Sequence, residues 1–346
     1  MTVDGGRTPT VDGGRTPTVD VHCHVTHPAC EALVADVFTP EVDPFFRYAT
    51  PASDEVNAAQ MEVNGAKFVD PELRIRDMDA MGIDVQAIAI APPQFYYWTD
   101  PELGARLSGM QNDRLAEIVA AYPTRFVGLG TLPMQDVDLA LRELERVAGE
   151  LGFHGLELCT NVNGVDLDDE RFAPFFRRVE ELELLVVFHP HGFSHGERLA
   201  SHYMINTVGM PMDSTVLISH LIFGGVLERF PGLQLCVVHG GGYLPFYPAR
   251  FDHAYGARPD VRQRITRPPS SYLRQLYFDT MVFDAVLLGR LVTDYGDDHV
   301  LLGTDYPFDM GESDPLGLLD RVEGLDDVAR ARIAGGNAAR LLRLER

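Results

Sequence analysis

Lysine is almost absent from this chain, because Lys67 is the only one among 346 residues and the other basic side chains are arginine. Basic residues are scarce altogether: 29 Lys and Arg stand against 51 Asp and Glu, which gives a net charge of −22. Nucleic acids and anionic membrane surfaces are bound through basic patches, so the composition argues against both as partners. We expect a small anionic substrate instead, bound by local positive charge from a metal ion or an arginine.

Cysteine pairs and long apolar runs are missing as well. The four cysteines, Cys23, Cys30, Cys159 and Cys236, form no C-x-x-C motif. The first residues lack the apolar centre of a signal peptide, and no stretch is apolar enough for a transmembrane helix. We therefore expect a protein of the reducing cytoplasm with free thiols.

The first residues hold a direct repeat. The unit TVDGGRTP begins at Thr2 and again at Thr10, and TVDVHCH begins at Thr18. A polar segment rich in glycine cannot bury an apolar core, and chain ends of this kind are usually unstructured. We expect residues 1–17 to be a disordered leader and residues 18–346 to form a single domain.

A glycine-rich loop is also absent after the first apolar run, where a doubly wound nucleotide-binding sheet would favour one. The chain instead has eight short apolar runs, from VDVHCH to HVLLGTD, separated by helix-like segments. Apolar runs without polar alternation are typical of parallel strands buried on both faces. Eight such units predict an α/β fold, the (β/α)8 TIM barrel. The stretch that follows the first run up to about Val69 contains four prolines, so we expect an irregular insertion there.

Histidines and an aspartate stand where these predicted strands end. His22 and His24 lie two apart at the end of the first strand and therefore point the same way. His189 ends the fifth strand, His239 the sixth and Asp305 the eighth, and in a barrel these ends meet at one mouth.

Imidazoles with one carboxylate suit Zn²⁺ or a similar divalent ion. We predict that His22, His24, His189 and Asp305 bind one divalent ion, Zn²⁺ in preference to Mn²⁺. The fourth strand, HGLELC, has no lysine that could bridge a second metal. His239 can then act as general acid and base on metal-bound water, and the alternative is that it is a further ligand.

Four of these motifs resemble those of the metal-dependent decarboxylases related to the amidohydrolases: VDVHCH, LLVVFHP, VVHGGG followed by PF and an arginine, and LLGTDYPF. The likeness runs from about Val19 to the C-terminus and includes DPELRIRDMDAMG, RFVGLGTLPMQ and GGVLERFPGL. It implies the ligand set given above, with His239 as the catalytic residue. It also implies a homodimer in which Arg250 reaches a substrate carboxylate in the neighbouring chain's site. The implied reaction is non-oxidative decarboxylation of a small unsaturated or aromatic acid, such as a carboxymuconate semialdehyde.

The chain departs from that family at two places. His191 stands where the family has a tryptophan, so it is a candidate substrate contact. The stretch NGAKFVDPE lacks the family's second substrate-binding arginine, and Lys67 could replace it only by position.

Two other chemistries fit parts of the sequence. Metal-activated water can attack a lactone or an amide, so a hydrolase or hydratase on the same barrel is the alternative. GFSHG, from Gly192 to Gly196, matches the nucleophile motif of serine hydrolases, with HGGG as an oxyanion motif. In those enzymes the oxyanion motif precedes the nucleophile, whereas here it follows, which argues against that mechanism.

Overall fold

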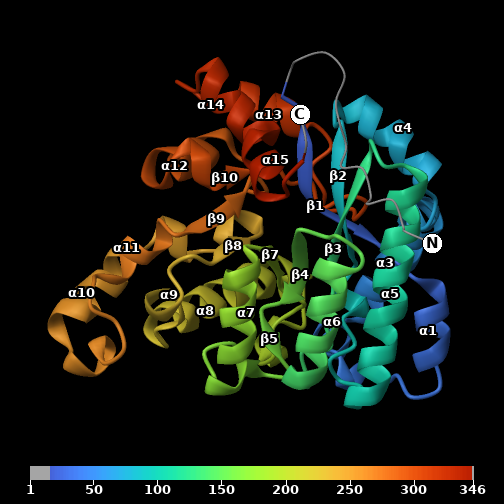
Figure 1. The fold of residues 1–346 in the computed structure, drawn as a ribbon, viewed down its shortest axis with the longest axis horizontal. Helices are drawn as coiled ribbons and strands as arrows, with labels where there is room; N and C mark the ends of the chain where they lie inside the picture. Colours follow the sequence, from blue (N-terminus) through green and yellow to red (C-terminus); the bar gives the residue numbers. More distant parts are fainter. Residues whose placement is uncertain (1–15, 345–346) are drawn as a thin grey trace.

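Eight parallel strands form the centre of the computed structural model, which describes residues 16–344 (Figure 1). They neighbour one another in chain order: β1 (Val19–Val25), β2 (Val85–Ile90), β3 (Phe126–Gly130), β4 (Gly155–Cys159), β7 (Leu185–His189), β8 (Gln234–Val237), β9 (Leu276–Asp279) and β10 (Val300–Leu301). The first and last strands also meet, because the Val21 amide donates to the Leu302 carbonyl (2.9 Å) and Cys23 forms a parallel bridge with Tyr306. The sheet is therefore a (β/α)8 barrel, as the eight apolar runs predict.

Helices alternate with the strands and surround the sheet. The longer ones are α4 (Pro71–Met81), α5 (Pro101–Ala121), α6 (Val137–Gly149), α7 (Ala173–Leu182), α8 (Met210–Phe223) and α12 (Ala285–Tyr295). The shorter ones are α9 (Val226–Arg229), α10 (Ala249–Ala257), α11 (Pro269–Leu273), α13 (Pro315–Asp320), α14 (Asp327–Ala331) and α15 (Asn337–Leu341). Aspartates cap several first turns, since the side chains of Asp70, Asp100 and Asp136 accept backbone amide hydrogen bonds there. A short hairpin, β5 (Asn161–Val162) and β6 (Val165–Asp166), follows β4.

The insertion after β1 consists mostly of helices, so the expectation of irregular chain is wrong for most of this segment. It contains α1 (Pro28–Val34), α2 (Pro44–Arg47) and α3 (Pro51–Asn64), with short 3₁₀ turns between them. Each helix begins at one of the prolines that suggested irregularity. Proline has no amide hydrogen to lose at the first helical position and a φ that suits it, so it starts a helix there.

One buried cluster contains residues from both the first and the last elements of the fold. Val19 and Val21 of β1 pack in one buried cluster with Leu301 of β10 and Leu341 of α15. All four cysteines are buried and free, as predicted. Within residues 16–344, no helix is long and apolar enough to cross a membrane. Residues 1–15 of the expected leader lie outside the described residues, and the single domain at 18–346 stays a prediction.

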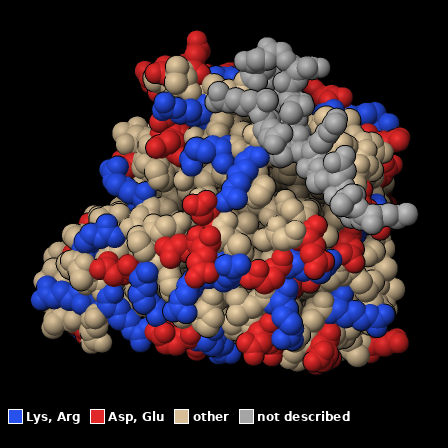
Figure 2. All heavy atoms as spheres, in the orientation of Figure 1, with Lys and Arg blue, Asp and Glu red and all other residues tan. Residues whose placement is uncertain are grey.

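The surface shows no large basic patch on the face in Figure 2, where Lys and Arg are interspersed with Asp and Glu. Many of these charges pair at short range, for example Arg178 with Glu145 at 2.6 Å and Arg146 with Asp113 at 2.7 Å.

Candidate metal centre

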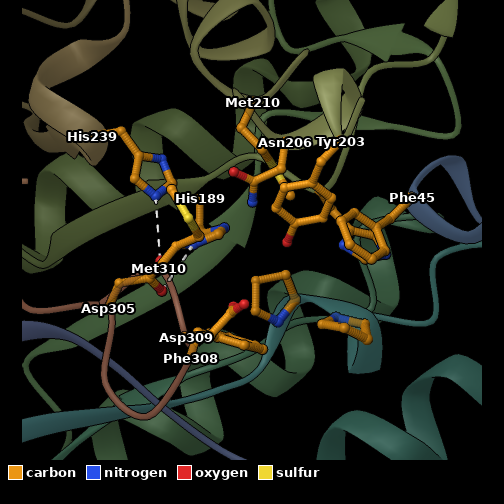
Figure 3. A pocket seen from close by; sticks show the side chains of 13 residues that line it. Phe45, His189, Tyr203, Asn206, Met210, His239, Asp305, Phe308, Asp309 and Met310 are labelled. Carbon is orange, nitrogen blue, oxygen red and sulfur yellow. Dashed lines mark ion pairs between the residues drawn. The ribbon is translucent and has the colours of Figure 1, made fainter. Parts of the chain in front are cut away.

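The structure brings together all five polar residues predicted at the strand ends. His22 and His24 come from β1, His189 ends β7, His239 follows β8, and Asp305 follows β10. Asp305 lies close to all four imidazoles, and Figure 3 shows it beside His189 and His239. Its Oδ1 is 3.3 Å, 3.1 Å and 3.9 Å from Nε2 of His22, His24 and His189, respectively. Its Oδ2 is 3.7 Å from Nε2 of His239.

This cluster has the size of a single-ion site. One ligand atom from each of His22, His189, His239 and Asp305 lies within 4.8 Å of all the others. His24 reaches the same carboxylate, and its ring centroid is 4.9 Å from that of His189. His24 and His239 thus approach different oxygens of Asp305, and both are close enough to serve as ligands.

Two of the imidazoles have a hydrogen-bond acceptor at Nδ1, which is Asp279 Oδ2 for His22 (2.6 Å) and the Pro190 carbonyl for His189 (2.6 Å). Nδ1 of His24 lies 3.4 Å from Glu157 Oε1 without a hydrogen bond to it. An acceptor at Nδ1 holds the proton there and leaves the Nε2 lone pair for a metal.

The free ring nitrogens support this assignment. Nε2 of His22 and Nε2 of His189 are buried and have no hydrogen-bond partner in the described part of the chain. Buried polar atoms without a partner are rare in proteins, because each one loses its hydration without compensation. Lone pairs aimed at one point beside a carboxylate form the donor set of a divalent ion, so the residues fit the predicted group.

The backbone is held in unusual conformations at two of these residues. His239 has φ 56° and Asp305 has φ 57°, in the left-handed region that non-glycine residues rarely adopt. Such conformations cost on the order of 1–3 kcal/mol each and are found mainly at functional sites. The Asp305 amide donates to the carbonyl of His22 at 2.7 Å, which fixes the position of its side chain next to β1.

The electrostatics at His189 and Asp305 favour the protonation states that bind metal. Burial lowers the pKa of His189 well below its usual value, which keeps this imidazole neutral. Burial would raise the pKa of Asp305, but His22 and the other imidazoles outweigh it and hold that pKa well below the usual value. Neutral imidazole and ionised carboxylate are the ligand forms of these side chains.

A cavity opens above the cluster (Figure 3). Its walls are mainly aromatic and methionine side chains with a few polar groups: Phe45, Pro92, Pro93, His191, Tyr203, Asn206, Met210, Phe308, Asp309 and Met310. His191 therefore lines the cavity, where its Nε2 lies 2.7 Å from Asp43 Oδ2 and its ring stacks on Phe45. Among the described residues that line this space, none is a lysine or an arginine.

The predicted cations lie elsewhere in the chain. Lys67 pairs with Asp77 at 2.9 Å and lines a different hollow, so it does not stand in for the family's arginine in this cavity. Arg250 is exposed on α10 and lines a third hollow beside Phe223 and Phe251. Arg47 of α2, which the sequence analysis did not single out, lines the hollow that adjoins the cavity at His191.

Two further residues of the site were missed from the sequence. Glu157 and Asp279 are the acidic residues inside the apolar runs GLELC and LYFD, and both are almost completely buried. A lone carboxylate inside an apolar strand was the available signal, because burying a charge without a partner is costly. The serine of GFSHG, in contrast, lies in a loop turn after β7 rather than on a strand-to-helix elbow.

Comparisons with known proteins agree with this geometry. Residues 19–344 match the sequence profile of the family described as amidohydrolase. The chain is 37% identical over 278 residues to 2-amino-3-carboxymuconate-6-semialdehyde decarboxylase of Dictyostelium discoideum, a match that covers 80% of this chain and 77% of that protein. It is 28% identical, with a TM-score of 0.85, to the crystal structure of 5-carboxyvanillate decarboxylase LigW from Sphingomonas paucimobilis, covering 95% and 100% of the two chains.

A third protein is similar in fold. It is a dihydroxybenzoic acid decarboxylase from a Polaromonas species, whose crystal structure contains manganese and the inhibitor 2-nitroresorcinol. It is 24% identical with a TM-score of 0.79, and the match covers 96% of this chain and 98% of that one.

Proposed function

Because the chain belongs to the amidohydrolase family, we propose that it is a metal-dependent carboxy-lyase that removes carbon dioxide, without oxidation, from a small unsaturated or aromatic acid. The observation that carries the proposal is the set of imidazoles around Asp305, whose Nε2 atoms face one point below the cavity. The relatives described above are decarboxylases, which favours carbon–carbon cleavage over the hydrolase or hydratase alternative.

In this proposal, His22, His24, His189 and Asp305 hold one divalent ion, with Zn²⁺ favoured over Mn²⁺. Such an ion, when bound, supplies Lewis acidity to an oxygen of the substrate or of water. The neutral His189 and the ionised Asp305 are ready to bind it, whereas the raised pKa values of His22 and His24 favour a proton that metal binding would displace. Burial would lower the pKa of His22, but the carboxylates of Asp305 and Asp279 outweigh burial and raise it.

His239 is proposed to move the proton that decarboxylation requires, since a hydrogen must replace the departing carboxylate on carbon. Its ring lies in the cavity wall, and Nδ1 has no partner among the described residues. No acceptor therefore fixes its tautomer, in contrast to His22 and His189, whose Nδ1 atoms each lie 2.6 Å from an acceptor. A ring of this kind can accept a proton at one step and return it at the next.

The substrate is proposed to be a planar acid similar to 2-amino-3-carboxymuconate 6-semialdehyde. The aromatic walls at Phe45, Tyr203 and Phe308 suit an unsaturated chain or ring, and His191 offers a polar contact beside them. The required positive charge comes from the metal and from Arg250 of a second chain in a homodimer. Arg250 is exposed on α10, which extends away from the barrel in Figure 1, and the exposed Tyr243 and Tyr247 precede it.

We also propose a cytoplasmic location, on the basis of the four free thiols.

The deciding experiment combines metal analysis of the purified protein with a product screen. Carboxylated muconate semialdehydes and hydroxybenzoates are the test substrates, and carbon dioxide is the measured product. We expect close to one divalent ion per chain and carbon dioxide release that a chelator abolishes. Hydrolysis of lactones or amides without any carbon dioxide release would instead establish the alternative, and two ions per chain with activity following the second would exclude a mononuclear centre.

A further inference from the structure

Asp279, the last residue of β9, contacts two different parts of the centre. It is completely buried, and its Oδ2 accepts the Nδ1 hydrogen of His22 at 2.6 Å. Its Oδ1 accepts the Gly240 amide at 2.8 Å and the Met281 amide at 3.3 Å. Both carboxylate oxygens are thus used, one on the ring of a predicted metal ligand and one on the loop that follows β8.

That loop needs support because of its conformation. Gly240 comes directly after His239, and four consecutive residues from His239 to Gly242 have positive φ. The hydrogen bond from the Gly240 amide to Asp279 therefore anchors the segment that presents His239 to the cavity. The Gly241 and Gly242 amides donate to the carbonyls of Val238 and His239 within the segment (both 3.1 Å), whereas the Gly240 amide is held from outside, by Asp279.

The contact between Asp279 and His22 leaves no spare room. A Cβ atom on Gly303, in the strand end beside them, would lie 2.9 Å from both Asp279 Oδ2 and His22 Cβ. Only glycine leaves this space for the pair. Asp279, as the acceptor, and Gly303, as the residue packed against it, thus fit one orientation of the His22 ring.

We propose that Asp279 is a positioning residue that orients the His22 ring for metal binding and at the same time anchors the loop carrying His239. The inference rests on the proposed metal-dependent function. A carboxylate only accepts hydrogen bonds, so it holds the His22 proton on Nδ1 and leaves Nε2 free. Because the same side chain also holds the Gly240 amide, it fixes the position of His239 relative to His22.

Asp279→Asn separates these two tasks. An amide has one accepting oxygen and one donating nitrogen, so it cannot accept from both His22 and Gly240. If the nitrogen faces His22, the ring must carry its proton on Nε2, and metal affinity falls. If the nitrogen faces Gly240, two donors meet, the loop moves, and kcat falls at saturating metal while metal affinity is retained.

Asp20→Asn is the matched control. Asp20 is also completely buried and lies on β1, two residues before His22. It accepts from the backbone amides of His22 and Thr304 and from the side chains of Gln86 and Thr304, but it touches no imidazole. Its substitution places an amide in the same buried region without changing the partner of a ring nitrogen.

The test measures Zn²⁺ and Mn²⁺ affinity of the apo forms of both variants by competition with a chromophoric chelator, and kcat at saturating metal. For Asp279→Asn we expect metal affinity or kcat to fall by about 10–100-fold, the usual effect of losing such an outer partner. Asp20→Asn should keep both near the values of the unmodified protein. Equal behaviour of the two variants in both measurements would overturn the proposal.

A second measurement does not depend on the variant folding. In the unmodified, metal-loaded protein with ¹⁵N-labelled histidine, the His22 signal should show a protonated Nδ1 shielded from exchange, assigned through its loss in His22→Gln. A His22 ring protonated at Nε2 would contradict the proposal. If the protein binds metal but releases no carbon dioxide from any acid, the proposed function fails while the metal affinities still decide the role of Asp279.

Discussion

At the residue scale, His239 differs from His22 and His189 in what lies behind its ring. Nδ1 of His22 and Nδ1 of His189 face acceptors at 2.6 Å, whereas Nδ1 of His239 has no partner in the described chain. Ligand imidazoles are nearly always held by such an acceptor. This difference favours His22 and His189 as ligands and His239 as the proposed proton-transferring residue, and substitution at His239 tests it.

We predict that His239→Ala keeps its metal and its fold and loses about 10²–10⁴ in rate, as expected for a general acid or base. The measurement is metal content together with turnover, and His189→Ala serves as the control that should lose metal. A metal-depleted His239→Ala protein that regains full turnover in excess Zn²⁺ would show that His239 is a ligand instead.

Asp213 of α8 gives the protein a pH dependence that does not involve the metal. Burial raises the pKa of its carboxyl to about 6, although hydrogen bonds from Thr160 and Asn161 oppose the shift. The folded state therefore holds a proton that the unfolded chain, with an ordinary pKa of 3.8, has already released. Stability from this group is greatest at low pH and declines as the pH rises toward about 6, above which it is constant.

Asp213→Asn should remove this dependence. Relative to the variant, the unmodified protein should lose up to about 3 kcal/mol of unfolding free energy between about pH 4 and pH 6, since each pKa unit corresponds to about 1.4 kcal/mol. Urea denaturation of both proteins across that range measures the difference. Parallel pH curves for the two proteins would show that the carboxyl titrates normally.

At the scale of single elements, the loop from His239 to Gly242 has the strictest backbone requirement. Gly242 adopts φ 70° and ψ −134°, a conformation essentially limited to glycine. A Cβ atom there would lie 2.2 Å from the carbonyl oxygen of Pro211, at the start of α8. The loop can therefore reach the cavity only because this position has no side chain.

Gly242→Ala is predicted to lower both the melting temperature and the activity, with a backbone cost on the order of 1–3 kcal/mol before the clash is counted. Gly149→Ala is the matched control, because Gly149 ends α6 and a Cβ atom there meets nothing within 4 Å. It should raise stability by about 0.5–1 kcal/mol, as alanine does in place of glycine in helices. Thermal unfolding of both variants tests the pair, and equal effects would contradict the loop argument.

The elements also show which features are predictable from the sequence. The barrel and the five converging residues follow from local patterns, since apolar runs mark strands and the topology places strand ends together. The carboxylates of Asp279 and Glu157 cannot be predicted in the same way, because their role depends on which side chain faces which imidazole across the barrel. Helix α3 is not predicted, because prolines in a sequence suggest interruptions as readily as helix starts. The cavity residues Tyr203 and Asn206 lie in a segment without a sequence pattern.

At the scale of the whole molecule, the cavity's lack of a basic side chain bears on the proposed homodimer. The chain has a net charge of −22, and the described cavity walls contain no lysine or arginine. An anionic substrate would be repelled by such a molecule, so an arginine from a second chain would improve both binding and orientation. Arg250 is the candidate, on the basis of its exposure and of the family likeness.

We predict that mixing Arg250→Ala chains with His239→Ala chains restores about one quarter of the unmodified activity, since random pairing gives half mixed dimers with one intact site each. Arg258→Ala, at the end of the same helix and paired with Asp260 at 2.6 Å, is the control and should leave activity unchanged. Dimers shown to have exchanged subunits, yet without recovered activity, would place Arg250 outside the neighbouring site.

The closure of the barrel between its first and last strands also has a consequence for synthesis on the ribosome. His24 and Asp305, which meet at 3.1 Å, are 281 positions apart in the chain. At about 5–20 residues per second, the imidazoles of β1 leave the ribosome on the order of tens of seconds before the carboxylate that completes their site. A nascent chain or a fragment that stops before β10 therefore carries histidines without the centre, and metal loading has to be a late event in the maturation of this protein.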